Sequence, residues 1–145
     1  MFMRNITLFL FWWFLFFSIS TSSADNEINL DIDENGEYDA LSDGLLIIRY
    51  LFGLTGDDLV SGILGSNSLV VEPIEIKSKL DSMRSHLDVD ENGSVDALTD
   101  GLLILRYLFG LRGDSLVTQV IGTGAARNSS ESIEDYVKSI MPSIT

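Results

Sequence analysis

Residues 30–60 read LDIDENGEYDALSDGLLIIRYLFGLTGDDLV, and residues 87–117 read LDVDENGSVDALTDGLLILRYLFGLRGDSLV. The two stretches are offset by 57 positions, and seven of their 31 aligned places differ. Self-similarity of this kind is the signature of one supersecondary unit that is used twice. The repeat therefore predicts two units, about 30–86 and 87–141, inside one domain of residues 25–145.

Each unit contains a block too rich in Leu for a strand, so we predict a buried helix that ends at a glycine. This helix covers residues 45–52 and 102–109 and ends at Gly53 and Gly110. A second, shorter helix follows, with an Asp after a Gly as its N-cap. It covers residues 58–64 and 115–121, with Asp57 and Asp114 as the caps.

A third helix is predicted in each unit, over residues 73–86 and 129–141, because apolar residues recur there at spacings of four and three. Those residues are Ile76, Leu80 and Met83 in the first unit and Ile133, Val137 and Ile140 in the second. Pro73 suits a first helical position, and Asn128 with Glu131 resembles a capping box. We expect an all-α domain, packed through its apolar helices, with no strand longer than a short bridge between loops.

The acidic loop that opens each unit has the pattern D-x-D-x-N-G. A hard divalent ion takes six to eight oxygens at about 2.3–2.6 Å, and a tightly curled loop can aim alternate side chains at it. Glycine at the sixth place permits the backbone turn. The candidate ligands are Asp31, Asp33, Asn35, Glu37, Asp39 and Asp43 in the first loop and Asp88, Asp90, Asn92, Ser94, Asp96 and Asp100 in the second. Glu37 and Ser94, at the seventh place, would offer their backbone carbonyls.

The charge of the two loops supports a cation at each. Residues 31–43 hold six acids and residues 88–100 hold five, together 11 of the 22 in the chain, with no Lys or Arg among them. Carboxylates packed so closely repel one another and work against folding unless a cation neutralises them. The sequence therefore predicts two Ca²⁺ per chain.

Two residues in each loop are candidates for closing the calcium shell. An EF-hand loop carries a bidentate Glu at its twelfth place, but here the twelfth residues are Ser42 and Thr99, and Asp43 and Asp100 are thirteenth. Either the loop is one residue longer and closes on that Asp, which we favour, or the Asp caps the helix and a hydroxyl or water closes the shell. A monodentate Asp predicts a Kd of ~10⁻⁵ to 10⁻³ M and poor competition by Mg²⁺.

These residues resemble the dockerin type I family, whose members carry two calcium loops, each followed directly by a helix. The resemblance covers residues 30–53 and 87–110 and implies Asp31, Asp33, Asn35 and Asp43, with Asp88, Asp90, Asn92 and Asp100, as ligands. It implies an adhesion module with a cohesin-like or other extracytoplasmic protein partner, in assemblies that degrade extracellular polysaccharides. In that family the tenth and eleventh loop places help to choose the cohesin, and here they are Ala40-Leu41 and Ala97-Leu98.

The N-terminus has the layout of a secretory signal peptide. Arg4 is followed by an apolar run of residues 6–19 and by Ser22-Ser23-Ala24, which predicts cleavage after Ala24. The alternative is a membrane anchor, but the run rises only ~21 Å as a helix, which is short of the ~30 Å hydrocarbon core, and no stop-transfer pattern follows. Because cleavage removes this run, we expect no stable membrane insertion of the mature chain. The protein is therefore predicted to be secreted or periplasmic.

Composition narrows the function further. The formal net charge is −13, which excludes a nucleic-acid binder because the phosphate backbone would be repelled. The chain has no Cys and one His, and it carries no serine-centred or phosphate-loop motif, so we predict no enzyme and no small-molecule substrate. The leading hypothesis is an exported calcium-binding interaction module. The alternative is a purely structural or calcium-buffering protein without a partner.

Overall fold

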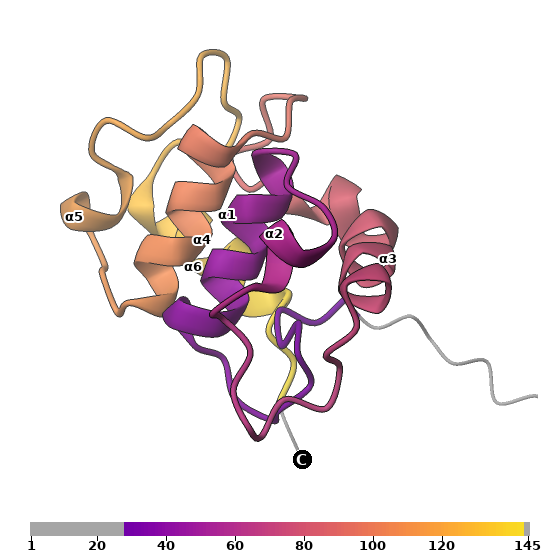
Figure 1. Cartoon of the computed structure of the whole chain (residues 1–145). Helices are drawn as coiled ribbons and strands as arrows, with labels where there is room; N and C mark the ends of the chain where they lie inside the picture. Colours follow the sequence, from indigo (N-terminus) through magenta and orange to yellow (C-terminus); the bar gives the residue numbers. More distant parts are fainter. Residues whose placement is uncertain (1–27, 144–145) are drawn as a thin grey trace, which may run out of the picture.

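The computed structural model describes residues 28–143, and this part of the chain is helical, with no strand (Figure 1). The prediction of an all-α protein is confirmed to that extent. The first half contains η1 (Ala40–Gly44), α1 (Leu45–Leu51), α2 (Asp57–Val60), α3 (Pro73–Met83) and η2 (Arg84–Leu87). The second half contains η3 (Ala97–Gly101), α4 (Leu102–Leu108), α5 (Asp114–Val117) and α6 (Ser130–Ser139).

The central helices begin earlier than the Leu-rich blocks, with a π-helical turn. In η1 the backbone N–H of Gly44 donates to the carbonyl of Asp39 over 3.2 Å, and Asp39 caps the turn by accepting from the N–H groups of Leu41 and Ser42. η3 repeats this arrangement. The predicted end is confirmed at Gly53, whose φ of +82° favours glycine. A buried turn of the wider π type therefore connects each acidic loop to its helix.

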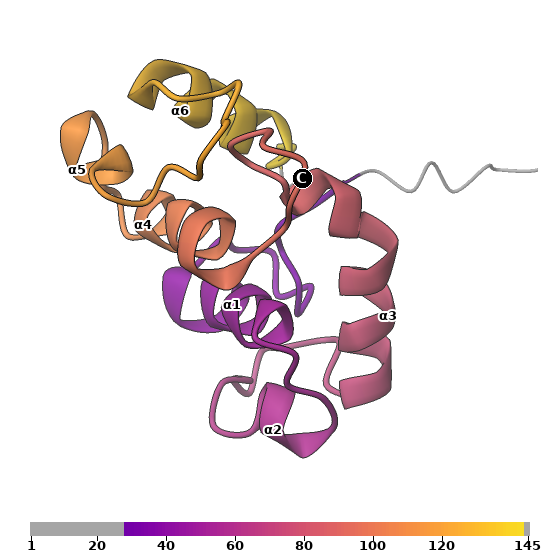
Figure 2. The ribbon, with the colours of Figure 1, turned by 90° about the horizontal axis from the view of Figure 1, so that it is seen from above.

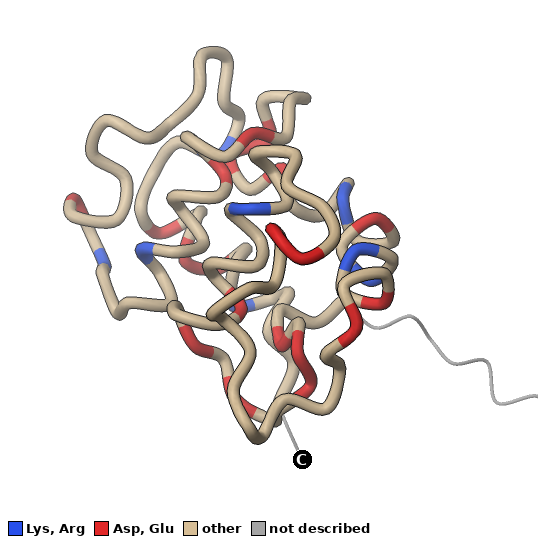
Figure 3. Tube along the Cα trace, viewed as in Figure 1, with Lys and Arg blue, Asp and Glu red and all other residues tan. Residues whose placement is uncertain are grey.

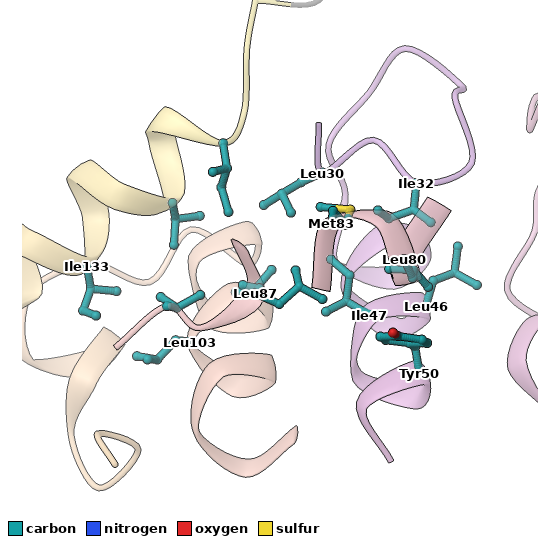
Figure 4. Packing of buried hydrophobic residues seen from close by; sticks show 14 of the residues in the cluster. Leu30, Ile32, Leu46, Ile47, Tyr50, Leu80, Met83, Leu87, Leu103 and Ile133 are labelled. Atoms are coloured by element: carbon teal, nitrogen blue, oxygen red, sulfur yellow. The ribbon is translucent and has the colours of Figure 1, made fainter. Parts of the chain in front are cut away.

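Helices α1 and α4 lie side by side at the centre, with α3 beside α1 and α6 beside α4 (Figures 1 and 2). The predicted apolar stripes of the third helices are buried, as expected from their spacing. Figure 4 shows how α1, α3, α4 and α6 bring their apolar side chains together. The fully buried members include Leu30, Ile32, Leu46, Ile47, Leu80, Leu87, Leu103 and Ile133.

The prediction for the second helices was wrong in extent and in cap. Both are single turns, because the chain becomes extended after them: ψ is 123° at Ser61 and 121° at Thr118. Positive φ values of 73° at Gly62 and 63° at Gln119 then carry the chain away from a helix. Asp57 and Asp114 are the first helical residues rather than the caps.

The prediction for the third helices needs smaller corrections. α3 starts at Pro73 as expected but ends at Met83, where the chain tightens into the 3₁₀ turn η2. α6 is capped by Ser129 with Ser132, not by Asn128 with Glu131, because the Ser129 Oγ accepts from the Ser132 N–H at 3.2 Å. The N-cap of α6 is thus one residue later than predicted.

The predicted signal peptide, residues 1–24, lies outside the described residues. Within residues 28–143, no helix has both the length and the apolar character that a bilayer crossing requires.

Candidate metal sites

Three Asp side chains converge in each acidic loop. Asp31, Asp33 and Asp43 each offer a carboxylate oxygen, and these oxygens lie within 4.8 Å of one another. Asp88, Asp90 and Asp100 form the matching group in the second loop. We call these groups trio 1 and trio 2. The loops that carry them lie in the lower and upper parts of the view in Figure 3.

The first half of each loop is curled by its own side chains. Asp31 Oδ1 accepts from the Asn35 N–H at 3.1 Å, and Asp31 Oδ2 accepts from the Gly36 N–H at 3.0 Å. The curl needs left-handed backbone, with φ of +57° at Glu34 and +84° at Gly36. Asp88 makes the same two bonds in the second loop. The D-x-D-x-N-G spacing therefore produces the tight curl that the sequence predicts.

Core packing orients the start of each loop. The apolar neighbours of the first Asp, Leu30 and Ile32, are completely buried, as is Asp33. The Ile32 N–H donates to Asp43 Oδ1 at 2.6 Å, and the Asp39 N–H donates to Asp43 Oδ2 at 2.9 Å. These bonds draw the thirteenth residue back over the first ones. Asp100 is held in the same way by Val89 and Asp96.

The thirteenth residues, Asp43 and Asp100, contribute carboxylates to the trios, whereas the hydroxyls of the twelfth residues bond to the helix caps. Ser42 Oγ donates to Asp39 Oδ2 at 2.9 Å, so this hydroxyl is engaged in the helix cap. Thr99 makes the matching bond to Asp96 at 2.8 Å and a longer one to Asp100 at 3.3 Å. Which residue closes each calcium shell stays a prediction, with the longer loop favoured from the sequence.

The remaining candidate ligands lie outside the trios. Asp39 and Asp96 serve as N-caps. The other four occupy the middle of the loops, where Asn35 Oδ1 accepts from the Glu37 N–H and Asn92 Oδ1 accepts from the Ser94 N–H, both at 2.8 Å. Glu37 and Ser94 are exposed. In this structure these amides and caps shape the loop around the carboxylates.

Burial controls the electrostatics of the trios. Removal from water raises the pKa of Asp43 to about 7, although two backbone hydrogen bonds oppose the shift. Burial likewise raises the pKa of Asp31 and of Asp100. Burial alone would also raise the pKa of Asp39, but hydrogen bonds from Ser42 and Leu41 lower it. The helix cap Asp39 is thus stabilised as a carboxylate, whereas burial outweighs the hydrogen bonds at Asp31, Asp43 and Asp100.

The donor set suits a hard divalent cation. The ion pairs among the described residues involve Glu34, Asp81, Glu91 and Glu134 and no member of either trio. Five of the six trio residues are buried, and their oxygens converge without a cationic side chain among them. Oxygen-only donors of this kind fit Ca²⁺ or Mg²⁺ rather than a softer metal.

Residues far from the loops also contact the trios, and sequence reasoning missed them. Ser68 Oγ donates to Asp33 Oδ2 at 2.6 Å, and the Gly122 N–H donates to Asp90 Oδ2 at 2.6 Å. Lys79 and Arg127 approach the loops from outside. These contacts depend on how the connecting segments cross the loops, and no motif in the sequence marks them.

Comparison of the chain with protein-family models, with curated proteins and with solved structures finds no match.

Proposed function

We propose that this protein is an exported calcium-binding module of dockerin type, in which two Ca²⁺ ions stabilise a helical protein-interaction domain. The observation that carries the proposal is the pair of buried Asp trios, formed at matching positions of a repeat. Two such groups in one small domain leave several carboxylates with little solvent and no cationic side-chain partner. A bound divalent ion offsets that cost, and its binding energy then becomes folding energy.

Calcium is favoured over magnesium by the number and kind of oxygens near each trio. Each trio supplies carboxylates from a loop that also offers amide and backbone oxygens nearby, which suits six to eight ligands at variable angles. Magnesium requires a nearly ideal octahedron and gives up its water reluctantly. Asp rather than Glu at the closing position favours a Kd of ~10⁻⁵ to 10⁻³ M, in the range of extracellular modules and weaker sensors.

A protein partner is supported by apolar residues that the fold leaves in solvent. Leu41 in η1 is 63% exposed and Leu98 in η3 is 62% exposed, and the repeat relates these two positions. Each lies two residues before the closing Asp of its loop. Calcium at the trios would therefore fix the backbone that presents both leucines, which links ion binding to partner binding.

A calcium titration tests the metal part of this function. Protein recovered from expression of the full chain is stripped with chelator and titrated with CaCl₂ in a calorimeter, with far-ultraviolet circular dichroism recorded in parallel. We expect two ions per chain and a gain in thermal stability, and MgCl₂ at the same concentration should give a much smaller gain. Absence of calcium heat together with unchanged stability would refute the proposal.

Capture from secreted material, with calcium or chelator, tests the partner part. We expect one defined protein to be retained only with calcium and lost with Leu41→Asp combined with Leu98→Asp. The control is Leu69→Asp, because Leu69 is also exposed, at 77%, but does not belong to the repeated loops. Calcium binding without any such capture would favour the alternative of a structural or buffering protein.

A further inference from the structure

Each acidic loop is contacted by one cationic side chain, and the contacts fall at matching positions of the two loops. Lys79 Nζ donates to the carbonyl of Asp31 at 2.5 Å and to Glu34 Oε1 at 3.0 Å. Arg127 Nη2 donates to the carbonyl of Asp88 at 3.1 Å, and Arg127 Nη1 donates to Glu91 Oε2 at 2.8 Å. We call Lys79 and Arg127 the loop cations. The repeat relates the contacted residues to each other, since both pairs are offset by 57.

The loop cations themselves are not related by the repeat. Val70 corresponds to Arg127, and Tyr136 corresponds to Lys79. The Arg127 guanidinium lies 3.8 Å from the centroid of the Tyr136 ring, and Arg127 Nε donates to the carbonyl of Val89 at 2.8 Å. The two units therefore place a cation at equivalent loop atoms through different pairs of residues.

We propose that Lys79 and Arg127 are positioning residues for the two calcium loops, each holding its own loop in the ion-binding shape. The inference rests on the calcium-binding function proposed above. The carbonyl that each cation contacts belongs to the first loop residue, so fixing it fixes the backbone from which a trio carboxylate projects. Orienting groups outside the ligand shell typically change metal affinity by 10–100-fold when they are lost.

The second contact of each loop cation supports the same role. Glu34 and Glu91 both have φ of +57°, which is costly for a residue with a Cβ and persists only where the surroundings enforce it. A cation bound to the Glu side chain and to a carbonyl three residues earlier bridges this strained segment. It also reduces repulsion within the acidic loop when no metal is bound.

A cation near a calcium site also repels the ion, so this repulsion must be compared with the gain from ordering the loop. Each loop cation is paired with a Glu, which leaves the pair close to neutral and screens the repulsion. The side chains of Lys79 and Arg127 are 22% and 20% exposed, while their Glu partners are 54% and 60% exposed, so the cations are held mainly by their bonds to the loop carbonyls. Ordering the loop should therefore outweigh repulsion, and loss of either cation should weaken calcium binding.

The experiment follows each loop separately in the full chain. The amide N–H groups of Gly36 and Gly93 donate to Asp31 and Asp88, so their nuclear magnetic resonance signals report the two loops. Calcium titrations are recorded for the wild type, Lys79→Met and Arg127→Met. Lys77→Met is the matched control, because Lys77 lies on the same helix as Lys79 but pairs with Asp81 at 2.6 Å.

Each substitution should act on one loop. Lys79→Met should raise the calcium concentration for half-saturation at Gly36 by about 10-fold and change it at Gly93 by less than about twofold. Arg127→Met should do the reverse, and Lys77→Met should change neither. Equal effects on both loops, no effect on either, or tighter binding at the loop that lost its cation would overturn the proposal.

A transplant separates positioning from general destabilisation. Val70→Arg together with Lys79→Tyr introduces the second unit's pair into the first, and it should restore the Gly36 response to within about threefold of wild type. Lys79→Tyr alone should not restore it. Failure of the double variant, in a chain that still shows the wild-type response at Gly93, would count against positioning by the cation.

The calcium function and the positioning role can fail separately. A wild-type chain without any calcium response at Gly36 and Gly93 would refute the proposed function. Hydrogen exchange in chelator then still tests the loop cations, because Lys79→Met should accelerate exchange at Gly36 by about 10-fold over its effect at Gly93. Uniform acceleration at both glycines would show that Lys79 has only a general structural role.

Discussion

Gly44 in η1 lies directly against Leu105 in α4, so closely that a Cβ on the glycine would sit 2.7 Å from Leu105 Cδ1. The repeat makes the contact reciprocal: a Cβ on Gly101 would lie 3.0 Å from Ile48 Cγ1 in α1. Each glycine follows the closing Asp of its trio, Asp43 or Asp100. The interface between the two units therefore begins one residue after each candidate metal site.

Gly44→Val should destabilise the protein, because its Cβ displaces the Leu105 side chain and its two methyl groups extend further toward α4, whose Leu105 Cα lies 3.7 Å from the Cβ position. Overpacking of this kind costs about 1–3 kcal/mol in the free energy of unfolding, measured by urea denaturation followed by circular dichroism. Leu41→Val is the control, since it puts the same side chain into the same turn at a site that is 63% exposed and should cost less than about 0.5 kcal/mol. Equal losses for the two variants would contradict a tight contact at Gly44.

Much of this arrangement could be predicted from the repeat. The calcium-type loop pattern, the Leu-rich helices and the apolar stripe of α3 each depend on local spacing, which is visible in the sequence. Gly53 ends α1 as its position suggests. The gathering of Asp31, Asp33 and Asp43 also follows, because a curled loop and a thirteenth-residue closure require it.

The rest depends on tertiary contacts that no local pattern encodes. The short second helices end where the chain turns extended at Ser61, although their composition would allow another turn. Asn and Ser are both good N-cap residues, so residue type alone does not choose between Asn128 and Ser129, and in the structure the cap is Ser129. Lys79 reaches the first loop from 48 residues away, a distance across which periodicity carries no information.

Asp43→Asn should remove one bound calcium per chain, whereas Ser42→Ala should leave two. The structure places Asp43 in trio 1 and uses the Ser42 hydroxyl in the helix cap. Loss of a ligand carboxylate should weaken that site by more than about 100-fold, beyond the effect of outer partners. Calorimetric stoichiometry measures this, and retention of two ions in Asp43→Asn with one in Ser42→Ala would assign closure to the twelfth residue instead.

The calcium-free protein should become less stable as the pH rises from about 4 to about 7. The pKa of Asp43 is raised from 3.8 to about 7 in the folded chain, so the folded state binds more protons than the unfolded state between those values. The free energy of unfolding therefore falls as the pH rises through this window. Thermal melts in chelator should show a falling Tm, and calcium should remove or reverse the trend because it binds the ionised carboxylates.

Thermal melts of Asp43→Asn over the same pH range test whether Asp43 causes the pH dependence. Both oxygens of Asp43 accept backbone N–H bonds, so the amide of the variant loses one of them, but it has no proton to release in this pH range. The Tm of the variant should therefore vary less steeply with pH than that of the wild type. An unchanged slope would mean that other carboxylates control the pH dependence.

Ser129→Ala should lower the free energy of unfolding by about 1 kcal/mol, because it removes the acceptor for the Ser132 N–H at the start of α6. Asn128→Ala is the control and should cost less than about 0.5 kcal/mol, since its side chain makes only a 3.5 Å contact with the carbonyl of Ala125. Urea denaturation of both variants measures the difference. A larger loss of stability for Asn128→Ala than for Ser129→Ala would assign the cap to Asn128.

Gly122→Ala should impair trio 2 while the corresponding change in the first unit, Gly65→Ala, leaves trio 1 intact. A Cβ on Gly122 would lie 2.7 Å from Asp90 Oδ2 and would also overlap the Asn92 amide, so both side chains must move. A Cβ on Gly65 would meet only Asn67, 2.8 Å from its Oδ1, and Asn67 is exposed and can turn away.

The expected result is a loss of calcium affinity of about 10-fold or more at the second loop of Gly122→Ala, read from the amide signal of Gly93, with the Gly36 signal unchanged. Gly65→Ala should match wild type at both glycines. The two substitutions add the same methyl group at positions that the repeat relates, so helix propensity and chain entropy largely cancel between them. Equal effects of the two would mean that the close approach of the backbone at Gly122 does not shape the second site.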